Sequence, residues 1–216
     1  MNMRATSGRL RSSAESELYC ELSTAFAPCE FHVKWAAGAW EHAQALKLRR
    51  AVFCVEQGLF DGDDLDEIDK QAQCIVALSC VGGMADQLVG TVRIHEHRES
   101  GPGVWWGSRL AVHAAFRQHS RLGATLIRLA VASAHARGCR RFFAHVQSQN
   151  VTLFERLGWA SLGPVQLHGR PHQLMQADLA QYPPCHAPFT GYVAQAKPSA
   201  CLSACLSARL SARLSA

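Results

Sequence analysis

The most regular pattern of apolar and polar positions lies between residues 104 and 137. Val104 to Val112 is a run of aromatic and aliphatic residues, which favours a buried strand. The segment from Arg117 to Leu122 is polar and basic and favours a loop. Residues at helical spacing then form an apolar face that ends before Gly138: Leu122, Leu126, Leu129, Ala130 and Ser133. The pattern therefore predicts a strand, a loop and a long amphipathic helix.

Shorter patterns predict the elements that precede this unit. Residues 31–35 alternate as a half-buried strand does, and residues 72–81 and 87–95 predict two antiparallel strands joined by a glycine turn. Between the first strand and this pair we expect a helix with one apolar face, made of Trp40, Ala43, Leu46, Ala51, Val52 and Val55.

The elements that follow the long helix are short. Residues 141–146 predict a strand, residues 151–157 a helix, and residues 160–167 and 172–179 the two strands of a terminal hairpin.

The two ends of the chain differ from its middle. Residues 1–28 show no period, and the composition changes at residue 182 before the chain ends in repeats of Cys-Leu-Ser-Ala and Arg-Leu-Ser-Ala. We therefore expect a disordered leader over residues 1–28, one domain over 29–181 and a low-complexity tail over 182–216.

Composition narrows the class of protein. The net charge of the 216 residues is +5, from 22 Lys and Arg against 17 Asp and Glu, and this mild, scattered charge does not indicate nucleic-acid binding. The nine cysteines include no Cys-x-x-Cys pair, so no zinc site is expected. No secretory signal and no apolar run of 18 residues is visible, so we expect a cytoplasmic protein without membrane contact.

An acidic stretch runs from Glu56 to Asp69. Its spacing is reminiscent of a calcium loop, but the glycine and the closing glutamate are misplaced for one. Two interpretations stay open, a solvated surface loop and a site for a basic substrate. The start of the long helix suggests a second site, because unpaired N–H groups and flanking arginines there can hold a phosphate.

Several segments resemble those of one protein family. Over residues 31–179 the chain resembles the GNAT superfamily of acyl-CoA-dependent N-acetyltransferases. The segment RAVFCVEQ (50–57) and the aspartate-rich loop after it are similar to the ElaA-like group. Three further segments are similar to a bacterial subgroup associated with nitrogen starvation: WWGSRL (105–110), AHVQSQN (144–150) and HGRPH (168–172).

The resemblance implies an α+β fold with a mixed, mostly antiparallel sheet that splays open between flanking helices. It also implies acetyl-CoA as co-substrate and no metal. The pantetheine would pair with the backbone of Leu110, Ala111 and Val112. The pyrophosphate would rest on the loop and helix start formed by Arg117, Gln118, Arg121, Leu122, Gly123 and Ala124.

Two positions depart from the family pattern. The phosphate loop is one residue longer than usual and has Arg121 in place of the first glycine, which requires a different backbone path or direct use of the guanidinium. Asn150 and Phe154 would lie along the cofactor, but the family often has a tyrosine at the Phe154 position to protonate the departing thiolate. Phe154 has no such proton, so another acid or water serves, or the thiolate leaves unaided.

The reaction requires a base for the amine and a donor for the oxyanion. Candidate bases are Glu56, Glu96 and His145, and Glu56 and His145 are selected as catalytic residues. We expect neighbouring carboxylates to raise the pKa of Glu56. The backbone N–H of Val112 is the expected oxyanion donor.

Five residues are expected at the acceptor site. Asp66 would attract a cationic amine, Trp106 and Arg109 would line the pocket, and His172 would face it from the hairpin. Arg50 is assigned to substrate binding, with pairing to the acidic loop as its alternative.

The resulting hypothesis is transfer of an acetyl group from acetyl-CoA to the primary amine of a small molecule by direct attack. Two alternatives stay open. One is acyl transfer as in autoinducer synthases, which share this fold and an early region similar to Arg50, Phe53, Glu56 and Asp66. The other is a non-catalytic acetyl-CoA-binding regulatory subunit. Since terminal hairpins often pair subunits in this fold, a homodimer is also considered.

Overall fold

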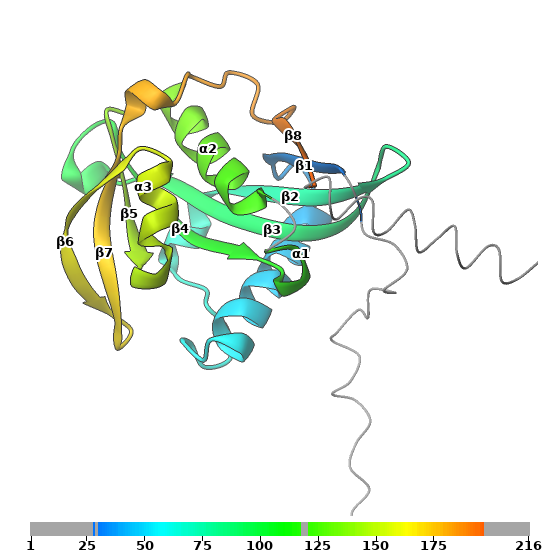
Figure 1. The fold of residues 1–216 in the computed structure, drawn as a ribbon, viewed down its shortest axis with the longest axis horizontal. Coiled ribbons are helices and arrows are strands. Elements are labelled where there is room, and N and C mark those ends of the chain that lie inside the picture. The colour runs from blue at the N-terminus through cyan, green and yellow to red at the C-terminus, as the bar shows by residue number, and fades with distance from the viewer. Residues whose placement is uncertain (1–27, 29, 118–120, 197–216) are drawn as a thin grey trace, which may run out of the picture.

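A computed structural model describes residues 28, 30–117 and 121–196, which form an eight-stranded sheet (Figure 1). The spatial order is β6-β7-β5-β4-β3-β2-β1-β8. Only the β4–β5 pair is parallel. The strands are β1 (Glu30–Trp35), β2 (Gln73–Val81), β3 (Met84–Glu96), β4 (Val104–Val112), β5 (Arg141–Gln147), β6 (Trp159–Leu167), β7 (Arg170–Ala177) and β8 (Tyr192–Gln195). This is the mixed, mostly antiparallel α+β fold expected from the sequence.

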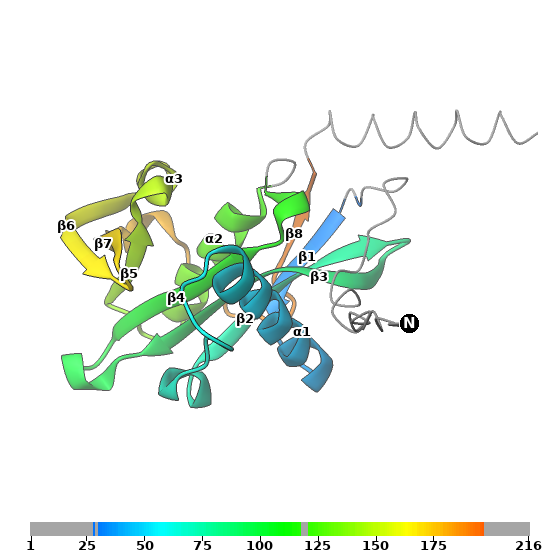
Figure 2. The same ribbon diagram turned by 90° about the horizontal axis from the view of Figure 1, so that it is seen from below.

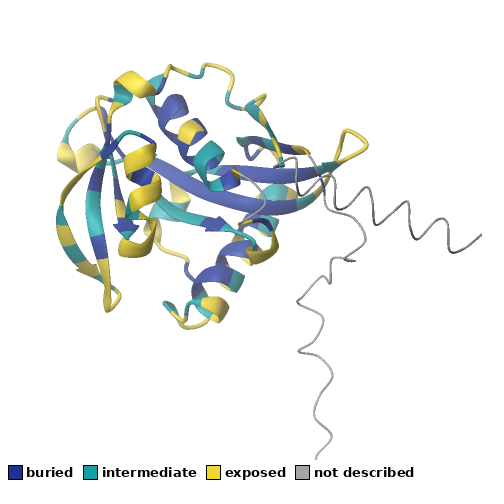
Figure 3. Ribbon diagram, viewed as in Figure 1, coloured by how far each residue is buried: buried dark blue, intermediate teal, exposed yellow. Residues whose placement is uncertain are grey.

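Helices cover both faces of the sheet. α1 (Ala39–Arg49) lies on one face and continues as a π-helix over Arg50–Glu56, whereas α2 (Leu122–His135) and α3 (Val151–Arg156) lie on the other (Figures 1 and 2). The larger hydrophobic core forms between the sheet and α2. Figure 3 shows buried residues both on α2 and on the strands beneath it. In the described part of the chain, none of the helices has the length and apolarity required to cross a bilayer.

The apolar face predicted for α1 and its continuation is wrong at most positions, although Val52 is buried as expected. Trp40 and Val55 are 49% and 63% exposed, and the residues that face the sheet are instead Ala45, Leu48, Arg49, Val52 and Phe53. These positions follow the spacing i, i+3, i+4, i+7 and i+8 of one helical face. An arginine stands in the middle of that face, so a count of apolar residues alone selects a different side of the helix.

The sheet opens between β4 and β5. The two strands pair only from Val104 to Gly107 against Arg141 to Ala144, and each then continues without the other. On its other side, β4 carries a bulge, because Arg109 and Leu110 together oppose a single residue of β3. Arg109 has a φ of 54°, which is unusual for a residue other than glycine. The splay and the bulge lie side by side on β4.

The sequence predicts that the domain ends at residue 181, but the folded chain continues beyond that residue. Tyr182 is buried, donates a hydrogen bond from its hydroxyl to the carbonyl of Leu157 and accepts one from Trp159 Nε1. β8 then pairs antiparallel with β1 at the sheet edge. Residues 182–196 therefore belong to the folded unit. The leader expected over residues 1–28 and the terminal repeats lie outside the described residues, except for Pro28.

Candidate active site

A cavity of about 470 Å³ lies where β4 and β5 separate. The half of its wall that belongs to the α2 core is apolar: Ile127, Ala130, Val131, Phe142, Ala144, Val146 and Phe154. The opposite half is rich in polar and aromatic groups: Phe60, Asp66, Arg93, His95, His97, Trp106, Ser108, Arg109, His145, His168 and His172. The cavity thus passes from one face of the sheet to the other through the splay.

Successive side chains of β5 point alternately to the apolar and the polar half of the cavity wall. Phe142 and Val146 are buried in the α2 core. Phe143 and His145 contact Trp106 on the opposite face, with ring centroids 5.4 and 4.9 Å apart. The structure therefore places His145 on the polar side of the splay, an orientation that the sequence left open.

The backbone of Val112 is directed into the opening. The His113 N–H donates to the carbonyl of Val89 at 2.9 Å, which makes Gly90 and Val112 a pair without direct hydrogen bonds between them. The N–H and carbonyl of Val112 consequently point away from β3, toward the gap beside β5. Leu110 lines the cavity from the bulge, whereas the side chain of Ala111 is buried in the α1 core. The strand end expected to meet the pantetheine therefore offers backbone groups to it.

The described residues cover the start of α2 only in part. Arg121 precedes the helix, is exposed and makes no side-chain cap, and beyond the neighbours of Gly123 and its own helix backbone no atom of a described residue lies within 4 Å of the position of a Cβ on Gly123. Leu122 is fully buried, so only its backbone is available to a ligand, and the next residue, Ala124, is partly buried against the core. Gln118 lies outside the described residues.

The pKa of Glu56 is lowered, not raised as the sequence predicts. Arg117 donates two hydrogen bonds of 2.6 Å to its carboxylate, and these bonds hold the pKa of Glu56 below its usual range against the opposing effect of burial. Neighbouring cations rather than carboxylates surround it, since His113 also lowers this pKa. Arg117 in turn donates from Nε to the carbonyl of Val112. Glu56 therefore positions Arg117 and does not fit the role of a base.

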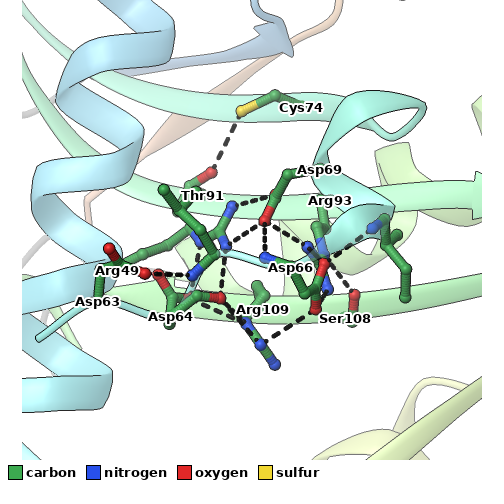
Figure 4. A network of polar contacts seen from close by, with 12 residues as sticks. Arg49, Asp63, Asp64, Asp66, Asp69, Cys74, Thr91, Arg93, Ser108 and Arg109 are labelled. Atoms are coloured by element: carbon green, nitrogen blue, oxygen red, sulfur yellow. Dashed lines mark hydrogen bonds and ion pairs between the residues drawn. The ribbon is translucent and has the colours of Figure 1, made fainter. Parts of the chain in front are cut away.

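The acidic loop is held by three arginines, Arg49, Arg93 and Arg109 (Figure 4). Arg49, 5% exposed, binds Asp64 at 2.8 Å and Asp69 at 2.6 Å. Arg93 binds Asp69 at 2.7 Å and donates two hydrogen bonds of 2.6 Å to Asp66. The loop is thus an internal ion-pair network, which favours neither a calcium site nor a free acidic surface.

Two residues that the sequence assigned to substrate binding, Arg50 and Asp66, lie in or next to this network. Arg50 is exposed, does not line the cavity and makes no ion pair with any described residue, because its neighbour Arg49 occupies the inner face of the helix. Asp66 does line the cavity, but Arg93 and Arg109 both bind it. Burial alone would raise the pKa of Asp66, yet the hydrogen bonds and charge of Arg93 lower it overall. Its negative charge is therefore already balanced.

Neutral imidazoles face the polar half of the cavity. Burial lowers the pKa of His145, and the charge of His172 lowers it further. Burial and the charge of Arg93 likewise lower the pKa of His95. His172 is buried in β7 and lies on the cavity wall as expected, with Nδ1 2.9 Å from the carbonyl of Arg170. At neutral pH, His145 and His95 can accept protons.

The sequence did not identify His95, His97 or His168 as site residues. His95 and His97 occupy alternate positions at the end of β3, and His95 pairs in register with Trp106. That alternation was a readable signal. Glu96, the candidate base between them, points elsewhere: its carboxylate accepts a hydrogen bond from the N–H of Gly103 at 3.1 Å. His168 packs edge-on against Phe60 with ring centroids 4.7 Å apart, a contact that only the fold could reveal.

Asn150 and Phe154 both line the cavity at the start and on the inner side of α3. Phe154 is 7% exposed and packs edge-on against Trp159 at a centroid distance of 5.0 Å. Phe154 is thus a core residue that also forms part of the cavity wall.

The chain is similar to proteins of one known family. The family model described as acetyltransferase (GNAT) family matches residues 41–159, which include the splay, the bulge and the start of α2. The chain belongs to the acetyltransferase (GNAT) family. As a member of that family it is an acyltransferase. No curated protein matches the sequence significantly.

Solved structures of this family share the fold. A protein of Lactobacillus plantarum assigned as an N-acetyltransferase is 25% identical, with a TM-score of 0.60 over 68% of this chain and 97% of its own. An acyl-CoA N-acyltransferase from Pseudomonas aeruginosa is 20% identical, with a TM-score of 0.55 over 68% and 99%. ElaA of Escherichia coli is 21% identical, with a TM-score of 0.53 over 69% and 99%.

Proposed function

We propose that this GNAT protein transfers an acetyl group from acetyl-CoA to the primary amine of a small molecule. The observation that carries the proposal is the cavity that passes through the splay beside a strand end whose backbone groups point away from β3. Donor and acceptor can enter such a cavity from opposite faces of the sheet and meet where the strands separate, beside Gly107 and Ala144.

On the helix side, the residues fit a coenzyme A ester. Val112 directs its N–H and its carbonyl, which accepts a hydrogen bond from Arg117, away from β3 toward the gap, where an extended pantetheine amide can meet them. The apolar wall from α2 and α3 suits the methylene groups of the pantetheine. The first N–H groups of α2 and the exposed Arg121 suit the pyrophosphate. Arg117, aligned by Glu56, places a further guanidinium beside the same strand end.

On the other side, His145 is the base that the geometry supports best. Its imidazole is neutral at neutral pH and takes a proton from the attacking ammonium or amine. The amine nitrogen then bonds to the thioester carbon, the N–H of Val112 stabilises the oxyanion, and the C–S bond breaks. Because Phe154 has no acidic proton, the thiolate receives its proton from water or leaves unprotonated.

The proposal is tested by two measurements on the full chain. Calorimetry should detect coenzyme A binding at micromolar concentration, and a thiol-release assay with acetyl-CoA should show turnover with at least one amine from a panel of amino acids, small amines, polyamines and aminoglycosides. Coenzyme A binding without thiol release from any amine would favour the regulatory-subunit alternative. Absence of coenzyme A binding would contradict the proposal altogether.

One observation favours a second donor class. The wall on the helix side includes Ile127 and Ala130 of α2 and Phe142 of β5, so it offers apolar surface to a chain longer than acetyl. A longer acyl chain, as in the autoinducer-synthase alternative, would use that surface. Comparison of acetyl-, butyryl- and octanoyl-CoA in the same assay separates the two donor classes by their kcat/KM values.

A further inference from the structure

The polar half of the cavity offers no free negative charge to an amine. Among the described residues that line it, Asp66 is the one carboxylate, and Arg93 and Arg109 both bind it. A polycationic acceptor would therefore meet two guanidinium groups and no unpaired anion. The site favours an acceptor that brings a negative charge of its own.

Three hydrogen-bonding groups on this half of the wall lack protein partners. Trp106 Nε1 and His95 Nδ1 are buried and have no hydrogen-bond partner in the described structure. Arg109 donates from Nε and Nη2 to Asp64 and Asp66, while no described residue accepts a hydrogen bond from its Nη1, and Figure 4 shows one end of this guanidinium directed out of the network. Buried groups without a partner, as Trp106 Nε1 and His95 Nδ1 are, occur rarely in folded proteins unless a ligand or water satisfies them.

The three groups lie close together on β3 and β4. His95 and Trp106 are a register pair, the neighbouring pair on the same face is Arg93 with Ser108, and Arg109 follows at the bulge. The guanidinium of Arg109 lies 4.4 Å above the ring of Phe60, which holds it at the cavity wall. Burial and the charge of Arg93 lower the pKa of Arg109, although the charges of Asp64 and Asp66 oppose this shift.

From this arrangement we infer that the acceptor carries a carboxylate beside its amine, as an α-amino acid does, and that Trp106, His95 and Arg109 recognise that carboxylate. Trp106 Nε1–H and Arg109 Nη1–H are donors that match carboxylate oxygens, and His95 donates as its Nδ1–H tautomer. The inference rests on the proposed function and names the substrate class of its acceptor site.

Matched acceptor pairs test the inference. Each pair consists of an amino acid and the amine left when its carboxylate is removed: phenylalanine with phenethylamine, leucine with isopentylamine, and tryptophan with tryptamine. Thiol release from acetyl-CoA is expected to show a kcat/KM at least about tenfold higher for the amino acid of the best pair, the ratio typical of one charge-assisted hydrogen bond. A preference for the decarboxylated amines would overturn the inference while leaving the acyltransferase proposal intact.

Two single-residue variants provide a control within one strand. Trp106→Phe removes the indole N–H and keeps an aromatic ring against His145, so the preference for amino acid over amine should fall about tenfold. Trp105→Phe makes the same change at the neighbouring residue, whose indole N–H is also buried without a partner in the described structure. The side chain of Trp105 packs in the α2 core and does not line the cavity. The preference of this variant should stay at the wild-type value, and equal losses in the two variants would contradict the assignment.

A binding measurement keeps the test independent of catalysis. In the presence of coenzyme A, calorimetry should show tighter binding of N-acetylphenylalanine than of N-acetylphenethylamine, or the same order for the best pair of the panel. If no amine is acetylated but the carboxylate still strengthens binding, the proposed function fails and carboxylate recognition stands. Equal affinities for the two compounds would reject carboxylate recognition.

Discussion

At the scale of single residues, the position of one arginine decides how the acidic loop is held. Arg49 and Arg50 are adjacent and identical in type, yet Arg49 is buried among Asp64 and Asp69 while Arg50 faces solvent. The sequence assigned Arg50 to substrate binding and offered pairing with the acidic loop as its alternative, whereas the arginine that pairs with the loop is Arg49. Which of the two pairs depends on the side that α1 turns toward the sheet, and composition does not carry that information.

This difference makes a direct prediction about stability. Arg49→Met should lower the free energy of unfolding by about 3 kcal/mol, because removal of one partner from a buried ion-pair network leaves charges buried without full compensation. Arg50→Met, the matched control, should change it by less than about 0.5 kcal/mol. Urea unfolding of both variants provides the comparison, and similar small changes in the two would show that the network contributes little.

A second prediction at this scale concerns pH. The pKa of His145 lies below its usual value, so its neutral, base-competent form predominates above that pKa and is lost as the pH falls through it. Turnover at saturating acceptor should therefore be constant near neutral pH and decline only as the pH falls through this lowered pKa.

His145→Gln should lower kcat about 100-fold and remove this decline, while Glu56→Gln should keep it, because the carboxylate of Glu56 serves Arg117. A pH–rate profile that loses its acidic limb in Glu56→Gln but keeps it in His145→Gln would reverse the assignment.

At the scale of elements, the sequence predicted most of the fold and less of the site. The strands over residues 104–112 and 141–146 and the helix from Leu122 agree with the structure because their apolar periods are long and unbroken. Leu110, Trp106, Arg109, Asn150, Phe154 and His172 do line the cavity. The bulge at Arg109 and the ring contacts of His168 depend on pairing between distant segments, and no local pattern reports such pairing.

At the scale of the whole molecule, the end of the domain lies later than its composition suggests. A chain that stops at Gln181 loses Tyr182, its two buried hydrogen bonds and the β8 pairing with β1. It should unfold with a free energy at least about 3 kcal/mol lower, the range for loss of a buried aromatic side chain. A chain that stops at Ala196 is the control and should match the full chain in thermal unfolding; equal stability of both truncations would place residues 182–196 outside the cooperative unit.

The short parallel seam between β4 and β5 has a mechanical consequence. Four residue pairs join the strands on one side of the splay to β5, β7 and β6 on the other, and few other bonds cross it, among them Gln147 to Gln57 at 3.0 Å and Arg170 to the carbonyl of Gln57. The two parts of the sheet are thus joined by a short run of strand pairing, while one hydrophobic core beneath α2 spans both, and the cavity lies at the open end of the seam. A molecule bound in the cavity would contact both parts of the sheet, so occupancy should slow amide hydrogen exchange along β5 and β7.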